Sequence, residues 1–327
     1  MYERPTFQDV LKARRRIAPY LLRTPLHYYP VLSEMLGFEV YIKHENHHPT
    51  GSFKVRGGIN LLSQLSAEEK QKGLITASAG NHGQSIAYAS KLFGAQATVV
   101  VPEKANPDKV ESMRALGANV LFHGKDFEES RLHAEELAEK HGYRYVHAAN
   151  EPLLIAGVGT MGLEIMEDLP DIETILVPIG GGSEAAGIGI VAKTLKPQTE
   201  VIGVQAEGAP AFYLSWKEGR IVETPSINTM ADGLATRRAF ELTLEIIRDL
   251  LDDFILVSDD EIRSAIRLLL SKTHNVAEGA GAATTAAAVK LKERLKGRKV
   301  ALVLSGGNIT MEELRKILNE EPNPKLV

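Results

Sequence analysis

One lysine stands in a segment whose composition could present its amine to a ligand. Lys54 follows Pro49-Thr-Gly-Ser-Phe53, and a helix is predicted to begin at about Arg56. A lysine beside an aromatic ring in a partly desolvated site has a lowered pKa, and its neutral amine can attack an aldehyde carbon. The alternative is a surface lysine beside a turn, and this segment by itself does not decide between the two.

A second segment combines three glycines with a hydroxyl side chain. Residues 180–183, Gly-Gly-Gly-Ser, lie between the apolar run 175–179 and a predicted helix that begins at about Glu184. Glycines let the backbone close on an anion, and a helix N-terminus offers free N–H groups and the positive end of its dipole. The segment is neither a Walker loop, since no Gly-Lys-Ser/Thr follows, nor a dinucleotide fingerprint, since Ala185 replaces a glycine. It predicts a phosphate-monoester cup or a tight strand-to-helix turn.

Two further loops follow apolar runs and carry small polar groups. Ser78-Ala-Gly-Asn-His-Gly offers several amides to a carboxylate, and Ser305-Gly-Gly-Asn offers a hydroxyl group. In open α/β sheets, ligands bind beyond the carboxyl ends of the strands. Together the four segments supply an amine for an aldehyde, a phosphate cup, a carboxylate cup and a hydroxyl for a ring nitrogen. Pyridoxal phosphate (PLP) would use all four.

A different motif raises an alternative reaction class. His44-Glu45-Asn-His-His48 matches the H-E-x-x-H pattern of zinc peptidases. That chemistry needs a helix, because two histidines four residues apart must share one face to bind the metal. Here the segment follows the strand-like run 40–43 and precedes Pro49, which disfavours a helix at the residue before it. A polar strand-to-loop segment is the favoured interpretation, and a zinc peptidase is the distant alternative.

The elements that must position these segments follow a βαβ pattern. Short apolar runs alternate with longer helix-like stretches, which is typical of α/β folds with parallel sheets. Ser66 with Glu69, and Ser258 with Glu261, fit the capping box at a helix start. Strands are predicted at 40–43, 73–77, 97–101, 119–122, 174–178, 201–205 and 299–304.

Composition excludes several classes of protein. The 327 residues include 44% hydrophobic and 24% charged residues, which is typical of globular chains and argues against disorder. A net charge of −4 argues against a nucleic-acid partner that is bound by phosphate neutralisation. Cysteine is absent, so disulfides and thiolate nucleophiles are excluded. Because no signal peptide and no apolar stretch of about 18 residues is present, we expect a cytoplasmic protein without a membrane partner.

Taken in order, the motifs resemble those of a known family. PTGSFKVRG, SAGNHGQ, GGGS, ADGLATR and SGGN occur in the order found in fold-type II PLP enzymes of the serine/threonine dehydratase and serine racemase branch. The similarity extends over 25–308. Lys54 is followed by Val55-Arg56 rather than Asp-Arg, which favours the dehydratases over the cysteine-forming relatives. The resemblance implies an α/β fold like that of tryptophan synthase β, in which two domains have parallel-rich sheets flanked by helices. A small mobile domain, 66–146, would be inserted in a large PLP-binding domain, 1–65 and 147–327.

The resemblance also implies roles for individual residues. Lys54 would bind the PLP aldehyde covalently and would later serve as the base at Cα. A serine at the pyridine nitrogen, unlike an aspartate, does not hold the ring as a pyridinium, which favours expulsion of a β-hydroxyl group. The candidates are Phe53, Asn81, Gly233, Glu278 and Ser305 for the ring, Gly180, Gly181, Gly182 and Ser183 for the phosphate, and Ser78, Ala79, Gly80, Asn81 and His82 for the substrate carboxylate.

The implied activity is that of an L-threonine and L-serine dehydratase, which releases 2-oxobutyrate or pyruvate together with ammonia. Ala79 stands where serine racemases place a second base, so dehydration is favoured over racemisation. Glu207 matches a metal ligand of racemase-like relatives, but Tyr213 replaces the aspartate six residues later, so we predict no metal site. Dehydratases of 3-hydroxyaspartate or phenylserine, a serine racemase and a non-catalytic binding protein stay open as alternatives.

The resemblance implies a homodimer or homotetramer whose ligand is a small amino acid. Biosynthetic threonine dehydratases carry a regulatory domain of more than a hundred residues after the catalytic core. Because only 19 residues follow Asn308, we expect no such domain here.

Overall fold

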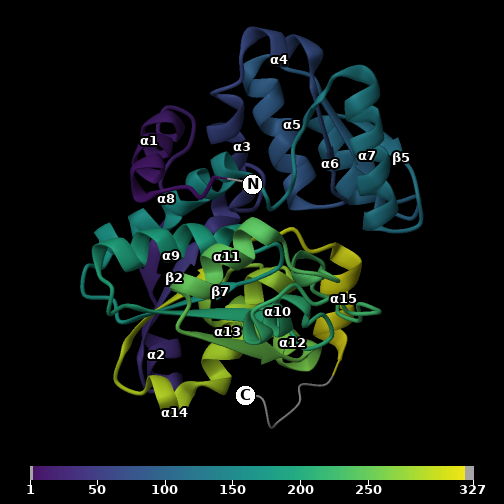
Figure 1. The fold of residues 1–327 in the computed structure, drawn as a ribbon. Coiled ribbons are helices and arrows are strands. Elements are labelled where there is room, and N and C mark those ends of the chain that lie inside the picture. Colours follow the sequence, from purple (N-terminus) through teal and green to yellow (C-terminus); the bar gives the residue numbers. More distant parts are fainter. Residues whose placement is uncertain (1–2, 321–327) are drawn as a thin grey trace. The chain divides into compact units, whose positions relative to one another are not determined.

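The computed structural model describes residues 3–320 and contains two compact units. The first unit consists of the residues up to Leu21 together with Lys54–Gly157, and the second consists of Leu22–Phe53 and the residues from Val158 onward. One boundary therefore falls between Phe53 and Lys54, and another falls within helix α8 (Pro152–Asp168) (Figure 1). Both units are mixed α/β structures with parallel-rich sheets flanked by helices, which confirms the predicted fold class.

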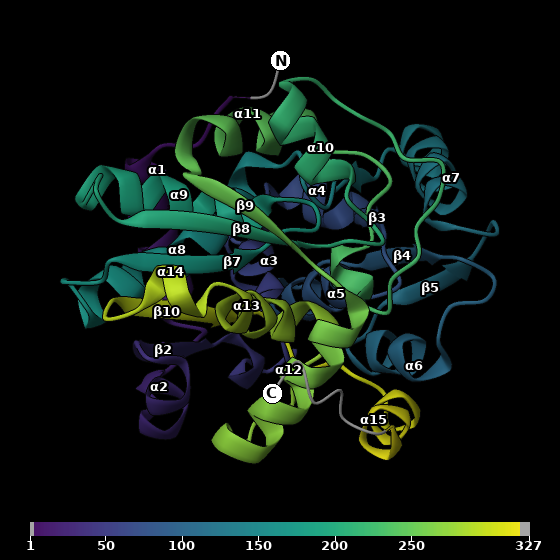
Figure 2. The same ribbon diagram turned by 90° about the horizontal axis from the view of Figure 1, so that it is seen from below.

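The second unit is built on a six-stranded sheet of order β1-β2-β10-β7-β8-β9, and β9, β8, β7, β10 and β2 follow one another in Figure 2. Neighbouring strands are parallel except for β1, which pairs antiparallel with β2. The strands are β1 (Leu26–Tyr28), β2 (Glu39–His44), β7 (Thr174–Pro178), β8 (Glu200–Ala206), β9 (Asp253–Val257) and β10 (Lys299–Leu304). The helical segments are α2 (Pro30–Leu36), η1 (Glu45–His47), α9 (Ser183–Leu195), α10 (Ala211–Glu218), η2 (Asp232–Leu234), α11 (Glu241–Leu250), α12 (Asp259–Thr273), α13 (Gly279–Lys290), α14 (Lys292–Leu295) and α15 (Met311–Asn319).

Small side chains allow α13 to lie directly on this sheet. Six of its alanines belong to the same core as Leu176 of β7, Ile202 of β8 and Leu302 of β10. Strand β7 is buried along its whole length, as expected for a central strand that is covered on both faces. The loops at 179–182 and 305–310, which follow β7 and β10, therefore begin at strands that are packed in the core.

The first unit contains a four-stranded parallel sheet of order β5-β4-β3-β6. Its strands are β3 (Leu74–Ala77), β4 (Ala97–Val101), β5 (Asn119–Phe122) and β6 (Arg144–Tyr145). Its helices, apart from the first part of α8, are α1 (Phe7–Ile17), α3 (Lys54–Leu62), α4 (Ala67–Lys72), α5 (Asn81–Phe93), α6 (Pro107–Ala115) and α7 (Phe127–His141).

The first unit is larger than the expected small domain, 66–146. Ile17 of α1 and Ile59 of α3 are buried in the same core as Ile86 of α5. Gly58 lets α3 approach α5 closely, because a Cβ atom there would lie 2.4 Å from Ser85 Oγ. This packing places α1 and α3 with the inserted sheet.

None of the helices between residues 3 and 320 reaches the length and apolarity that crossing a lipid bilayer requires.

Candidate active site

The glycine-rich loop after β7 forms a tight strand-to-helix turn. Gly182 is the N-terminal cap of α9 and has a φ of 85°, in the left-handed region that favours glycine. A Cβ atom on Gly180 would lie 1.9 Å from the carbonyl oxygen of Gly233, so the two backbones are in direct contact. The Thr243 hydroxyl donates to the Gly181 carbonyl oxygen over 2.8 Å. The structure thus brings Gly180, Gly181, Gly182 and Ser183 together with the distant Gly233, at the N-terminus of a thirteen-residue helix.

The loop after β10 gathers three of the predicted ring contacts. Phe53 N–H donates to the Ser305 carbonyl over 3.0 Å, and Glu278 N–H donates to the Gly306 carbonyl over 3.1 Å. A Cβ atom on Gly306 would lie 2.5 Å from Glu278 Oε1, so this glycine leaves room for the carboxylate. Phe53, Glu278 and Ser305 therefore meet at the carboxyl end of the large sheet. The second unit holds every predicted ring or phosphate residue except Asn81 and Lys54.

Lys54 and the predicted carboxylate loop belong to the first unit. Lys54 begins α3, and its carbonyl oxygen accepts a hydrogen bond of 2.7 Å from the Ser85 hydroxyl of α5. Residues 78–80 connect β3 to α5, and Asn81 and His82 are the first two residues of that helix. Gly80 N–H donates to Ser78 Oγ over 3.2 Å, which folds the loop on itself. The loop thus lies before the N-terminus of a helix, where backbone N–H groups favour a carboxylate.

Two buried histidines have strongly lowered pKa values. Burial lowers the pKa of His82 to about 3, and the positive charge of Lys54 acts in the same direction. Burial also lowers the pKa of His44 to about 3, with further contributions from His47 and His27. Both imidazoles are therefore neutral at physiological pH.

We expect these histidines to make the protein less stable as the pH falls below the ordinary histidine pKa. Because the folded pKa lies below the unfolded one, the unfolded chain binds more protons, and stability falls from about pH 6.5 towards pH 3. Each histidine contributes up to about 1.4 kcal/mol per pH unit in that window. The thermal denaturation midpoint, measured between about pH 7.5 and 5, should fall less steeply for His44→Gln than for the wild type. The exposed His141→Gln should retain the wild-type slope. Equal slopes for all three proteins would contradict the assignment.

The H-E-x-x-H segment does not form the helix that zinc chemistry requires. Residues Glu45–His47 form the short 3₁₀-helix η1, and His44 Nε2 lies 2.9 Å from the Tyr29 hydroxyl. Glu45 accepts a hydrogen bond of 2.6 Å from the Thr24 hydroxyl and pairs with His48 Nε2 at 3.1 Å. Between residues 3 and 320, no three His, Cys, Asp or Glu side chains are grouped to hold a metal ion. These buried contacts connect the end of β2 and the start of η1 to Thr24 and Tyr29.

An ammonium group stands beside the candidate metal ligand Glu207. Lys290 Nζ donates to Glu207 Oε1 over 3.4 Å and to the Leu256 carbonyl over 2.9 Å. The Tyr213 ring packs edge-on against Phe254, with ring centroids 5.6 Å apart. Tyr213 thus takes part in an apolar contact at the position where a second acidic ligand was sought.

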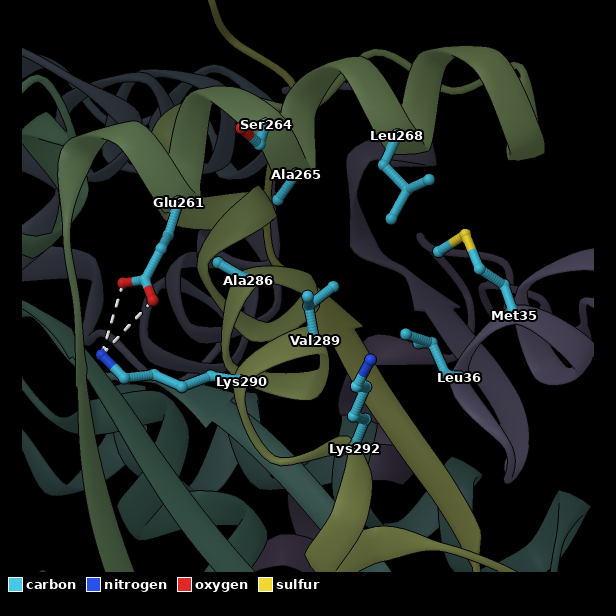
Figure 3. Close-up of a pocket in the computed structure, with 10 residues that line it drawn as sticks. All are labelled: Met35, Leu36, Glu261, Ser264, Ala265, Leu268, Ala286, Val289, Lys290 and Lys292. Atoms are coloured by element: carbon cyan, nitrogen blue, oxygen red, sulfur yellow. Dashed lines mark hydrogen bonds and ion pairs between the residues drawn. The ribbon is translucent and has the colours of Figure 1, made fainter. Parts of the chain in front are cut away.

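A cavity of about 250 Å³ lies among α2, α12 and α13 in the second unit (Figure 3). Within it, Lys290 turns towards Glu261, and the facing walls are mostly apolar. The lining residues are Met35, Leu36, Glu261, Ser264, Ala265, Leu268, Ala286, Val289, Lys290 and Lys292. None of them is a predicted coenzyme or substrate residue, although Lys290 also contacts Glu207.

Sequence patterns missed the residues that hold the loops in place. Thr243 fixes the Gly181 carbonyl and Ser85 fixes the Lys54 carbonyl, yet neither lies in a glycine-rich motif. A lone serine or threonine in a helix carries no local signal of this role. The available signal is indirect, since Gly58 marks the close approach of α3 to Ser85.

Comparison with known proteins identifies the family. A family model described as "Pyridoxal-phosphate dependent enzyme" matches residues 17–306. The L-threonine ammonia-lyase of Thermotoga maritima is 44% identical over 96% of this chain and 78% of its own length. The catabolic L-threonine dehydratase of Escherichia coli (strain K12) is 39% identical over 97% of each chain. The structure of maize serine racemase matches with a TM-score of 0.92 and 32% identity, covering 97% of each chain.

The chain therefore belongs to the family of PLP-dependent enzymes, in its fold-type II branch. The predicted recognition and cofactor are confirmed. The local structure also suits the coenzyme. A glycine cradle at a helix N-terminus fits a phosphate group, and the close approach of Gly180 to Gly233 leaves no room for a side chain there.

Proposed function

We propose that this protein is a PLP-dependent L-threonine ammonia-lyase that also acts on L-serine. The proposal rests on the glycine-rich loop at 180–183, whose backbone contacts the backbone of Gly233. The chain is similar over nearly its whole length to threonine ammonia-lyases. The products are 2-oxobutyrate from threonine or pyruvate from serine, each with one molecule of ammonia.

The coenzyme would be held by the residues that the sequence predicted for it. Gly180, Gly181, Gly182 and Ser183 would bind its phosphate with backbone N–H groups at the α9 N-terminus. Lys54, which follows Phe53 directly in the chain, would bind its aldehyde carbon. The proposed ring contacts are Phe53, Asn81, Gly233, Glu278 and Ser305. When bound, PLP supplies an electron sink for the pair that is released at Cα.

The remaining chemistry is assigned to the chain's own groups. The backbone N–H groups of 78–82, at the start of α5, would hold the substrate carboxylate. The substrate amine would take the place of Lys54 at the aldehyde carbon, which frees the Lys54 amine to take the Cα proton. The hydroxyl group would then leave Cβ together with one proton, as water, so that the elimination releases as much water as the later hydrolysis consumes. The released unsaturated amine tautomerises, and water hydrolyses it to the 2-oxo acid and ammonia. Ser305, which we propose faces the ring nitrogen, would favour this elimination, because a hydroxyl group does not hold a pyridinium as an aspartate would.

Elimination is preferred to racemisation because of Ala79. Racemisation needs a second acid or base on the opposite face of Cα, and a methyl side chain supplies none. Ala79 therefore supports a lyase, although the fold matches that of a serine racemase. A cytoplasmic homodimer or homotetramer that binds a free amino acid completes the proposal, and these points rest on the family resemblance.

A substrate comparison tests this proposal. The holoenzyme is assayed for 2-oxo acid and ammonia with L-threonine, L-serine, 3-hydroxyaspartate and phenylserine, and for D-serine by chiral chromatography. We expect L-threonine to have the highest kcat/KM, with 3-hydroxyaspartate and phenylserine lower by about tenfold or more. Ala79→Ser should raise D-serine formation relative to pyruvate. Faster turnover of 3-hydroxyaspartate or phenylserine, faster racemisation than elimination by the wild type, or bound PLP without ammonia release would each overturn the assignment.

A further inference from the structure

A buried threonine–histidine pair joins the end of β3 to the start of α5. Thr76 and His82 are 1% and 5% exposed. The Thr76 hydroxyl donates to the Val146 carbonyl oxygen over 2.8 Å, and His82 Nε2 lies 3.0 Å from Thr76 Oγ1. Three segments therefore meet at one hydroxyl group: β3, the first turn of α5, and the chain that leaves β6.

Counting protons fixes the form of the imidazole. A hydroxyl group has one proton, and Thr76 uses it towards Val146. The Thr76 oxygen can then interact with His82 Nε2 only as an acceptor, so Nε2 carries the proton. A second proton on Nδ1 is disfavoured because His82 is buried in the first turn of a helix, where the dipole repels a cation. These contacts favour the neutral Nε2–H tautomer of His82, and the Val146 backbone, which raises the pKa of His82, is a second hydrogen-bond partner of this imidazole.

The neighbouring His147 holds the chain that follows β6. Its Nδ1 accepts hydrogen bonds from Ala149 N–H and Asn150 N–H, each 3.0 Å long. Protonation of Nδ1 would break both bonds. Lys54 and His147 both act to lower the pKa of His82.

The same face of α5 carries the contact to Lys54. His82 and Ser85 are three residues apart and therefore lie on one side of the helix. Ser85 Oγ donates to the Lys54 carbonyl oxygen over 2.7 Å, so a rotation of the first turn of α5 would shift the start of α3. The loop at 78–80 is bounded by Thr76 in β3 and His82 in α5. Its shape depends on both anchors.

We propose that Thr76 is a positioning residue that fixes the tautomer of His82 and, through it, the first turn of α5 and the loop at 78–82. The expected kinetic effect rests on the proposed function, in which this loop binds the substrate carboxylate. The tautomer itself does not depend on that function. Loss of the hydroxyl group should therefore act on substrate binding more than on the chemical step.

The first test is a spectroscopic measurement on the wild-type holoenzyme with ¹⁵N-labelled histidine. Long-range ¹H–¹⁵N correlation spectra report the tautomer of each imidazole, and His82→Gln identifies the His82 signals. We expect neutral Nε2–H at His82 between about pH 6 and 8. A protonated Nδ1, either as the other neutral tautomer or as an imidazolium, would overturn the proposal whatever reaction the enzyme catalyses.

The second test uses three threonine variants. Thr76→Val keeps the side-chain shape and removes the hydroxyl group, Thr76→Ser keeps the hydroxyl group, and Thr98→Val is the control at a buried threonine of β4. Thr76→Val should raise the KM for L-threonine about tenfold, with a smaller change in kcat, and should shift or broaden the His82 signals. Thr76→Ser and Thr98→Val should keep KM values and His82 signals near those of the wild type.

Identical KM values and His82 spectra for Thr76→Val and Thr76→Ser would contradict the proposal. If Thr76→Val does not fold, the wild-type spectrum and Thr76→Ser still decide the tautomer. If the wild type turns over no threonine, the proposed function fails while the spectra still test the positioning role.

Discussion

Lys54→Ala is expected to lose threonine ammonia-lyase activity by about a thousandfold or more, because the group that binds PLP and takes the Cα proton is removed. The variant should also lose the visible absorbance of covalently bound PLP after dialysis. The measurements are 2-oxobutyrate formation from L-threonine and the absorption spectrum of the dialysed protein.

Lys91→Ala is the matched control, since Lys91 is an exposed lysine of α5 in the same unit. It should keep both the absorbance and the activity. Retention of both properties by Lys54→Ala would show that another group carries the coenzyme.

Gly180→Ala should have the second-largest effect. The new Cβ would lie 1.9 Å from the Gly233 carbonyl oxygen, and this neighbour is backbone, so the two loops must separate. Overpacking of this kind costs about 1–3 kcal/mol or more and would open the phosphate cup. We expect a lower thermal midpoint in the absence of PLP and at least about tenfold weaker PLP binding, measured by fluorescence titration.

Gly189→Ala provides the matched control in the following helix, α9. Its Cβ would lie 3.1 Å from Leu250 Cβ, a side-chain atom at the end of α11, and alanine is a better helix former than glycine. Its PLP affinity should equal that of the wild type. Equal PLP affinity for Gly180→Ala would argue that 180–183 is a structural turn without a role in phosphate binding.

Much of the fold follows from local patterns. Apolar runs predicted the seven strands β2, β3, β4, β5, β7, β8 and β10 to within one or two residues. The capping boxes at Ser66 and Ser258 both form, with side-chain and backbone bonds in each direction. Such features depend on neighbours within a few residues, which a sequence displays directly.

The elements that were missed lack such patterns. β6 has two residues, and β1 has three, two of them exposed, so neither provides a buried apolar run. β9 is an apolar segment, Asp-Phe-Ile-Leu-Val, that stands between two helices and was not assigned as a strand. The unit boundaries were also not predictable from the sequence, because α1 and α3 join the first unit through contacts between side chains that are distant in sequence.

The candidate site likewise has parts that the sequence predicts and contacts that it does not. Its motifs were recognisable because glycine and serine loops after strands are local. The contact between Gly180 and Gly233 joins residues that are far apart in the chain, and no periodicity reports it. His82 was predicted as part of the carboxylate loop. Its contact with Thr76 was not, and the Thr76 hydroxyl also donates to the carbonyl of Val146, seventy residues farther along the chain.

We propose that Lys54 carries the coenzyme of this enzyme, and locating the coenzyme on the chain tests this most directly. The holoenzyme is reduced with borohydride, digested and mapped by mass spectrometry. The predicted result is a pyridoxyl group on Lys54, which the Lys54→Ala variant should lack. Modification of a different lysine, such as the buried Lys43 that pairs with Glu164 at 2.6 Å, or no modified lysine in active enzyme, would contradict it.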